Sequence, residues 1–167
     1  MPVTLDVRPR TVTSALVIYL LALVPWMGGL LVLGAIVAPT VFHVVPAPSS
    51  ADAMTLVFRK FDALAISCAL VCLFAEAVLA WRGGKATRLD VVRGLTVVGA
   101  AACAITVGAW LSPAIHALHR SGAVRYVGAD GAELERLHRI AEMTAKLELT
   151  LLAAVLVLTL LRARRPT

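Results

Sequence analysis

Four long apolar segments dominate this chain of 167 residues. They cover residues 12–37, 61–81, 91–111 and 147–161. A helix needs about 20 mostly apolar residues to cross the roughly 30 Å hydrocarbon core of a bilayer. Inside lipid the backbone must satisfy its own hydrogen bonds, so such segments must be helical. The sequence therefore predicts an all-α, polytopic membrane protein, a four-transmembrane-helix bundle that forms one domain over residues 1–167.

The composition agrees with a bundle embedded in lipid. Hydrophobic residues make up 60% of the chain and charged residues 16%, whereas soluble domains carry about 25% charged residues. The net charge is +6, but the basic residues gather at the ends of the spans and no aromatic residues are interleaved with them. The lipid bilayer is therefore the expected partner, and nucleic acid is not. The first apolar segment is too long for the core of a signal peptide, so we expect an uncleaved first span.

The distribution of basic residues predicts the orientation. Four spans leave both termini on one side, and nine of the Lys and Arg residues fall there, crowded against span ends (Arg8, Arg10, Arg82, Lys85, Arg88, Arg93, Arg162, Arg164 and Arg165). The other side holds seven, five of them spread among acidic residues in one long connection. By the positive-inside rule we expect a multi-pass protein of the cell inner membrane with both termini in the cytoplasm.

The external connections differ in character. The first, at 39–60, contains Pro46 and Pro48, so we expect it to start extended and to end helical. In the second, the Asp130-Gly131 pair predicts a tight turn. After that turn a helix can begin at about residue 132, project by about three turns, and enter a last span at 143–162.

All four histidines fall on the predicted external face: His43, His116, His119 and His138. Imidazole nitrogens are ligands for copper, zinc and haem iron, and three or four that converge would form a site. Ordinary polar loop residues would have the same distribution, and no tight motif such as H-E-x-x-H is present. Both interpretations remain open at this stage.

Ionisable and thiol side chains also occur inside the predicted spans. Cys68, Cys72 and Glu76 follow one another at four-residue intervals, so they share one face of the second helix. The cysteines either offer soft ligands to Cu(I) or pack as small apolar residues. Because Cys103 also lies inside a span, no disulfide framework is expected. Glu76 faces protein, a wet cavity, or the cytoplasmic interface.

Glu148 lies deeper than Glu76. It is about 21 Å along the helix from Arg162 at 1.5 Å per residue, which places it within the hydrocarbon if Arg162 marks the cytoplasmic edge. It then sits in a polar cavity, or else the membrane boundary is higher and Glu148 is interfacial. Lys146 beside it is long enough to reach outward to the interface.

Small residues mark the expected helix–helix contacts. Glycines allow helix backbones to approach closely in membranes. The candidates are Gly28, Gly29 and Gly34 in the first span and Gly94, Gly99 and Gly108 in the third.

Two short motifs resemble those of a known family. Trp26-Met27-Gly28-Gly29 and the exit sequence Ala38-Pro39-Thr40-Val41-Phe42 are similar to the domain-of-unknown-function family 4149, the relatives of transmembrane protein 205. Further similarities are Phe58 to Phe61, Pro113 and Leu137-His138-Arg139. The family shows Ser and Asn after this His, where the chain has Ala141 and Ala145. The resemblance implies a small four-helix membrane protein without an assigned reaction, sometimes connected with export or drug tolerance.

The first span is also similar to the four-helix protoporphyrinogen oxidase of bacteria and to copper-resistance D proteins. Where that oxidase has a His before the Trp, the chain has Tyr19, and no Arg or Lys occurs between Arg10 and Arg59. The pair that the oxidase needs is missing, so the resemblance does not favour that reaction. Copper handling remains open through the histidines and the Cys68/Cys72 pair.

Together these patterns favour a protein that is not an enzyme. We expect a transport or export accessory that forms a homo-oligomer or binds a membrane partner. The alternative is a protein that binds copper, zinc or haem through His116, His119, His138 and His43. A redox reaction in the bundle would instead require a polar pocket that reaches Glu148.

Overall fold

The computed structural model describes residues 7–82 and 86–163, and within them every regular element is helical. The elements are α1 (Val7–Val32), the π-helical segment η1 (Leu33–Val37), α2 (Ala38–Val44), α3 (Ser49–Arg82), α4 (Arg88–Ile105), the π-helical segment η2 (Thr106–Leu111), α5 (Ser112–Arg120) and α6 (Gly128–Ala163). They join end to end into four rods, which are α1–η1–α2, α3, α4–η2–α5 and α6. Each rod is long and apolar enough to cross a membrane. The predicted all-α, four-helix architecture is confirmed, and the chain is a multi-pass integral membrane protein.

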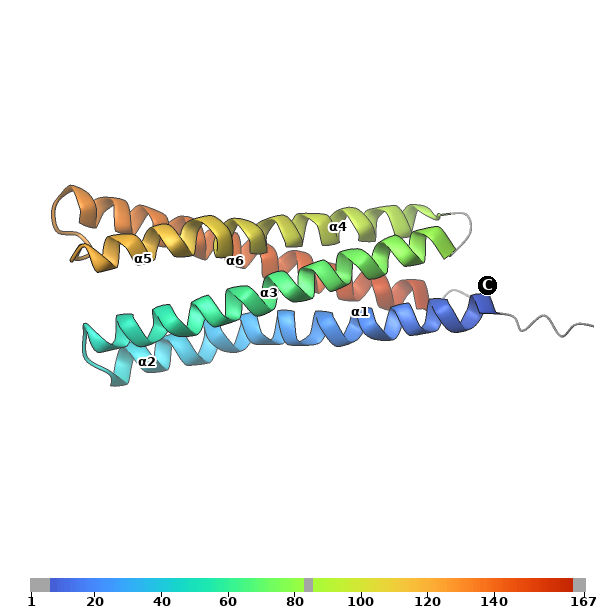
Figure 1. The fold of residues 1–167 in the computed structure, drawn as a ribbon, viewed down its shortest axis with the longest axis horizontal. Coiled ribbons are helices and arrows are strands. Elements are labelled where there is room, and N and C mark those ends of the chain that lie inside the picture. The colour runs from blue at the N-terminus through green and yellow to red at the C-terminus, as the bar shows by residue number, and fades with distance from the viewer. Residues whose placement is uncertain (1–6, 83–85, 164–167) are drawn as a thin grey trace, which may run out of the picture.

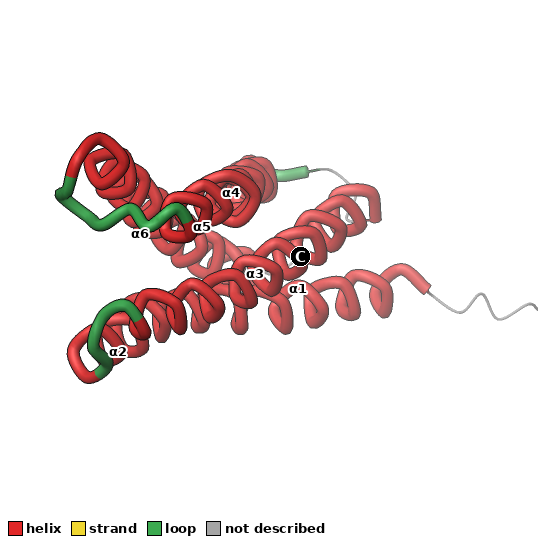
Figure 2. The backbone as a smooth tube through the Cα atoms, turned by 60° about the vertical axis from the view of Figure 1, so that its left-hand side comes forward, coloured by secondary structure: helices red, strands yellow, loops and turns green. Residues whose placement is uncertain are grey.

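The four rods form two antiparallel pairs (Figure 1). One pair is α1 with α3, and the other is α4 with α6. The start of α1 and the end of α6 lie at the same end of the bundle, and α6 also contacts α1. At the opposite end, where α2 and α5 lie, the two pairs diverge (Figure 2). The molecule is therefore closed at the end that holds the described termini and splayed at the other.

The core between the pairs is tightly packed. Its largest fully buried side chains include Tyr19, Leu23, Trp26, Leu152 and Val155. Alanines and cysteines fill much of the remaining core, because small side chains let membrane helices approach closely.

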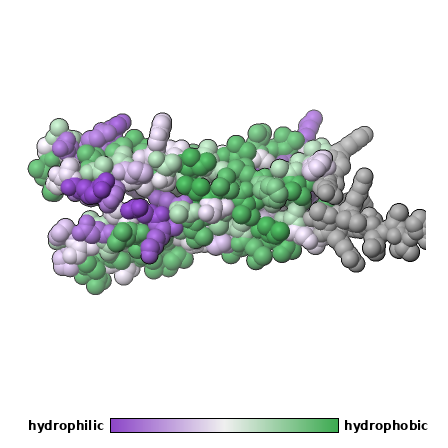
Figure 3. Space-filling model, in the orientation of Figure 1, coloured by the Kyte–Doolittle hydropathy of each residue, from purple (hydrophilic) through white to green (hydrophobic). Residues whose placement is uncertain are grey.

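The outer surface is apolar around the middle of the bundle and hydrophilic at the splayed end (Figure 3). Leu21, Leu95 and Phe74 are between 68% and 72% exposed, as expected for side chains that face lipid tails. Trp81 and Trp110 are also exposed, near opposite ends of this band. Tryptophans are enriched at both interfaces of a membrane, so these two are placed to mark its boundaries.

Two π-helical turns lie at the ends of predicted spans, and α2 and α5 continue the rods beyond them. In each, one amide donates to the carbonyl five residues earlier, from Ala38 to Leu33 and from Ser112 to Val107. A proline follows directly, at Pro39 and at Pro113. Proline has no N–H to donate, and the wider turn accommodates it without ending the helix. The expectation that the first connection starts extended at residue 39 was therefore wrong, since the helix continues to Val44.

The start of the last helix also differs from the sequence-based expectation. Helix α6 begins at Gly128, so Asp130 and Gly131 lie in its first turn and do not form the reversal before it. The Gly131 amide donates to Val127 at 3.2 Å, an ordinary helical bond. A Cβ atom at position 131 would overlap the Val124 carbonyl, so only glycine fits against the preceding connection.

Candidate functional site

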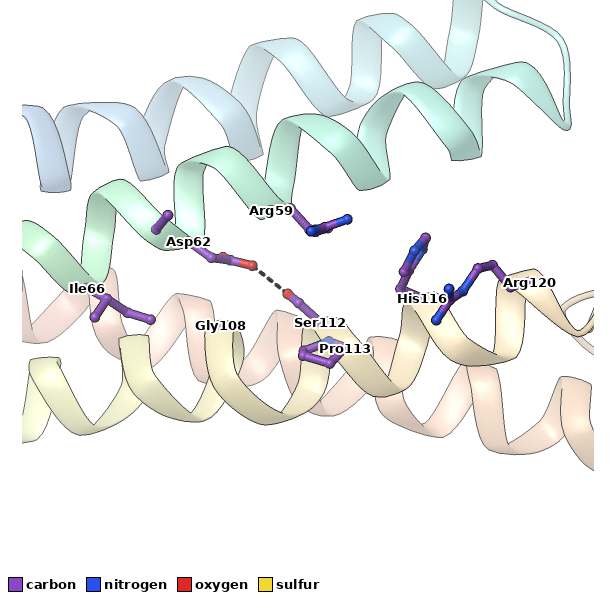
Figure 4. Close-up of a pocket in the computed structure, with 9 residues that line it drawn as sticks. Arg59, Asp62, Ile66, Gly108, Ser112, Pro113, His116 and Arg120 are labelled. Carbon is purple, nitrogen blue, oxygen red and sulfur yellow. Dashed lines mark hydrogen bonds between the residues drawn. The ribbon is translucent and has the colours of Figure 1, made fainter.

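A polar cavity of about 470 Å³ opens where the two helix pairs diverge. It lies between α3 and the η2–α5 rod (Figure 4). Its lining residues are Arg59, Asp62, Ala63, Ile66, Gly108, Ser112, Pro113, His116 and Arg120. Figure 3 shows hydrophilic side chains gathered around the indentation at this end of the molecule.

Three basic side chains enter this cavity from two elements. Arg59 extends from α3, and His116 and Arg120 extend from α5, into the same space (Figure 4). Among the residues that the structure describes, neither guanidinium has an ion-pair or hydrogen-bond partner. The outer part of the cavity therefore presents positive charge that no ion pair within the described chain neutralises.

The inner wall of the cavity carries one carboxylate. Asp62 is 9% exposed, and Ser112 Oγ donates to its Oδ2 at 2.6 Å. This contact depends on Gly108, because a Cβ atom there would lie 2.9 Å from Ile66 Cδ1 and 3.0 Å from Asp62 Cβ. Glycine thus lets the two rods approach closely enough for Asp62 and Ser112 to bond.

A second carboxylate, Glu148, lies inside the bundle. Its exposure is 3%, and Trp26 Nε1 donates a hydrogen bond to its Oε1 at 2.7 Å. On α1, Trp26 is one turn from Gly29, and Gly29 packs on Phe61 beside Asp62. Glu148 therefore lies about 5 Å further into the bundle than the cavity wall, at 1.5 Å rise per residue.

The other half of the bundle contains a buried ion pair. Arg93 Nε and Nη2 donate to the two oxygens of Glu76 at 2.7 and 3.0 Å. The guanidinium carbon of Arg93 lies 6.0 Å from the ring centre of Tyr19. The fully buried Tyr19 hydroxyl lies in the electrostatic field of Glu76 but makes no hydrogen bond of good geometry within the described chain. Cys72 Sγ contacts the Tyr19 carbonyl at 3.7 Å.

At the closed end, hydrogen bonds cap the start of α4 and connect it to α6. Thr87 and Asp90 form a reciprocal capping box at the start of α4. Arg162 Nε donates to the Asp90 carboxylate at 3.0 Å, which ties α6 to α4.

Of the basic residues that indicated the orientation, Lys85, Arg164 and Arg165 lie outside the described residues.

The structure brings two of the four histidines together. The rings of His119 and His138 meet edge to face with centroids 5.6 Å apart. His116 lines the cavity, and His43 is exposed in the last turn of α2. The described residues hold no group of three or more His, Cys, Asp or Glu side chains that could bind a metal ion. Metal binding by the histidines stays a prediction.

The other predicted polar positions are divided between the core and the surface. Cys68 and Cys72 are buried free thiols, and Glu76 on the same face is bound to Arg93. Lys146 is on the outside of α6, where its Nζ donates to Glu142 at 2.6 Å. Glu148 is therefore in the interior, whereas Lys146 is not.

The glycine candidates differ in how closely a neighbouring helix packs against them. A Cβ atom at Gly29 would lie 2.5 Å from the Phe61 ring, and one at Gly108 would lie 2.9 Å from Ile66 on α3. At Gly99 the nearest atom, in Leu151, would be at an ordinary 3.4 Å. Nothing lies within 4 Å of a Cβ atom built at three positions, so these do not permit close contacts within the chain (Gly28, Gly34 and Gly94).

Sequence reasoning did not identify several residues of these polar sites. They are Tyr19, Trp26, Arg59, Asp62, Arg93, Ser112 and Arg120. One signal was available for Arg93. It follows the start of the third span closely, and Glu76 precedes the end of the second, so the tight turn between these spans brings the two to similar depth.

The family model described as Domain of unknown function (DUF4149) matches residues 21–123. The chain belongs to this family. The matched segment in this DUF4149 protein contains Asp62, Ser112, Glu76 and Arg93, whereas Glu148 on α6 lies beyond it. No curated protein and no solved structure matches the chain. The likeness to transmembrane protein 205 stays a prediction.

Proposed function

We propose that this protein conducts protons as part of a transport function in the cell inner membrane, acting as a carrier or as an accessory to one. The observation that carries this proposal is the carboxyl group of Glu148, buried in the middle of an apolar membrane bundle. An ionisable side chain in a membrane span is costly and by default marks a pathway or relay. Within the described chain, only Trp26 donates a hydrogen bond to this carboxyl group.

The order of polar groups along the bundle supports a pathway. The cavity with Asp62 lies at the splayed end, Glu148 is about one turn deeper, and Tyr19 with Glu76 is about two turns deeper again. Asp62 and Glu148 are close enough for their charges to interact. Protonatable groups therefore follow one another from the open end toward the closed end.

The orientation belongs to the same proposal. The closed end holds both described termini and the connection between α3 and α4. Its basic residues favour the cytoplasm by the positive-inside rule. In this orientation the cavity opens to the outside of the inner membrane, and Glu76 with Arg93 lies toward the cytoplasm.

The test is proton flux in liposomes with the dye pyranine trapped inside. After an external pH step, with potassium and valinomycin present to remove any membrane potential, wild-type vesicles should equilibrate faster than empty ones. E148Q removes the titrating group and should reduce the rate to that of empty vesicles. The matched control is E142Q, an exposed carboxylate on the same helix, which should behave as wild type. Equal rates for E148Q and wild type would contradict the proposal.

A second candidate, metal handling at the outer face, is favoured by the pairing of His119 with His138. The Nδ1 atom of His138 lies 2.9 Å from the Leu134 carbonyl, which fixes the ring and leaves Nε2 free to bind. Metal analysis and a visible spectrum of untagged protein in detergent test this candidate. Near-stoichiometric copper, zinc or haem that is lost in H119A and H138A would support it, and equal metal content in wild type and variants would contradict it.

A further inference from the structure

We infer that the cavity between α3 and α5 binds a phosphate-bearing anion through Arg59, His116 and Arg120. This inference rests on the proposed function in taking the cavity as the outer entrance, and it names the class of ligand that enters there.

The charge of the two cavity arginines is not compensated by ion pairs. Arg59 and Arg120 contribute two guanidinium groups against the single carboxylate of Asp62. Elsewhere on the outer half, arginines form ion pairs with glutamates. Arg125 binds Glu135, and Arg136 binds Glu133. The two arginines of the cavity have no such partner among the described residues. They face a hollow space, and an anion placed in that space would satisfy them.

The hydrogen-bond donors of the cavity have a geometry that suits a phosphate group. A guanidinium is planar and presents paired N–H groups that match two oxygens of a phosphate. One guanidinium enters from α3, and the other enters from α5 together with the His116 imidazole (Figure 4). Donors from two directions suit a tetrahedral group with several oxygens better than a planar carboxylate. The Asp62 carboxylate on the inner wall accepts its hydrogen bond from Ser112, so the two guanidinium groups remain free to bind the anion.

The size of the cavity and its depth in the membrane also suit such a ligand. The cavity is about 470 Å³, within the range of small-molecule sites. Asp62 and Ser112 lie at the outer limits of the second and third apolar segments, so the cavity is at the level of lipid headgroups. A soluble phosphate ester and the headgroup of an anionic phospholipid share the same chemistry and both reach this level.

The experiment measures binding to the purified full chain in uncharged detergent. Calorimetry with sn-glycerol 1-phosphate tests the soluble source. Native mass spectrometry after incubation with phosphatidylglycerol or phosphatidylcholine tests the lipid source. The variants R59Q and R120Q each remove one guanidinium. K60Q is the matched control, since it removes one positive charge next to Arg59 from a residue that does not line the cavity.

We expect R59Q and R120Q to weaken binding at least tenfold while K60Q stays within twofold of wild type. This pattern with glycerol phosphate supports the site and assigns it to a soluble ligand. The same pattern seen only in the retention of phosphatidylglycerol supports the site and assigns it to a lipid headgroup.

Two outcomes overturn the inference: no binding of either probe, or equal weakening in all three variants. Melting curves in detergent establish that each variant is folded. Proton flux of the same preparations separates the two proposals. Proton flux without anion binding overturns only the proposed anion site. Anion binding without proton flux overturns only the proposed proton pathway.

Discussion

The carboxyl group of Glu148 shows how much one contact can matter for a buried polar group. Burying a polar group without a partner costs several times more than an ordinary hydrogen bond contributes. Trp26 supplies the donor from a different helix, and its indole also fills the core at that level. Replacing the Trp26 indole by a ring that has no N–H would leave the Glu148 carboxyl group without a hydrogen-bond donor from the described chain.

We therefore expect W26F to lower the free energy of unfolding by about 1–3 kcal/mol, as for other buried groups that lose a partner. The melting temperature in detergent should fall by several degrees. W110F is the control, because Trp110 is 78% exposed at the surface. If both variants melt at the same temperature, the Trp26–Glu148 bond does not stabilise the bundle.

The sequence could predict that Glu148 is unusual, but it could not predict that Trp26 is its hydrogen-bond partner. A charge in an apolar segment is conspicuous, so Glu76 and Glu148 were identified. Trp26 is 122 positions from Glu148, and their meeting depends on how α6 packs against α1. The arginines of the cavity were missed for a similar reason. Exposed arginines near span ends are common, and only the divergence of the helix pairs turns these two toward one space.

At the scale of the elements, close approach of the rods is set by individual glycines. Gly29 and Gly108 face α3 at distances where a methyl group does not fit, and three other candidate glycines face open space. The sequence showed which segments are rich in small residues. It could not show which glycines face a neighbour, because that depends on the rotation of each helix about its axis.

G108A should push α5 away from α3, because Asp62 Cβ is close to the backbone and cannot move freely. We expect a fall of several degrees in melting temperature together with at least tenfold weaker binding of the probe that the wild-type protein binds, glycerol phosphate or phosphatidylglycerol. G94A on the same rod has open space around it and should be neutral or slightly stabilising, since alanine favours helices over glycine by roughly 0.5–1 kcal/mol. Identical melting of the two variants would show that the tight contact is unimportant.

For the whole molecule, the sequence predicted the number and kind of helices correctly, because the need for about 20 apolar residues per span leaves few alternatives. It ended two of the helices too early: the rods that carry the π-helical turns continue past their apolar segments, to Val44 and to Arg120. Hydropathy describes contact with lipid, and these outer turns are held by helix–helix contacts instead.

The proposed orientation predicts which engineered cysteines are accessible from outside. The native cysteines are buried and should react slowly with a membrane-impermeant maleimide. In intact spheroplasts S121C, between α5 and α6, should be labelled rapidly, whereas R88C at the start of α4 should be labelled only after lysis. Both positions are exposed in the structure. The reverse pattern would invert the topology and place the cavity on the cytoplasmic side.

The two π-helical turns give the bundle an uneven stiffness. Each interrupts the regular hydrogen-bond ladder at η1 or η2, directly before a proline, on rods from opposite helix pairs. Bending in long helices concentrates at such points. Between these turns and the closed end the core is continuous and densely packed. The outer tips can therefore bend at the level of η1 and η2, while the packed helices nearer the closed end keep their positions relative to one another.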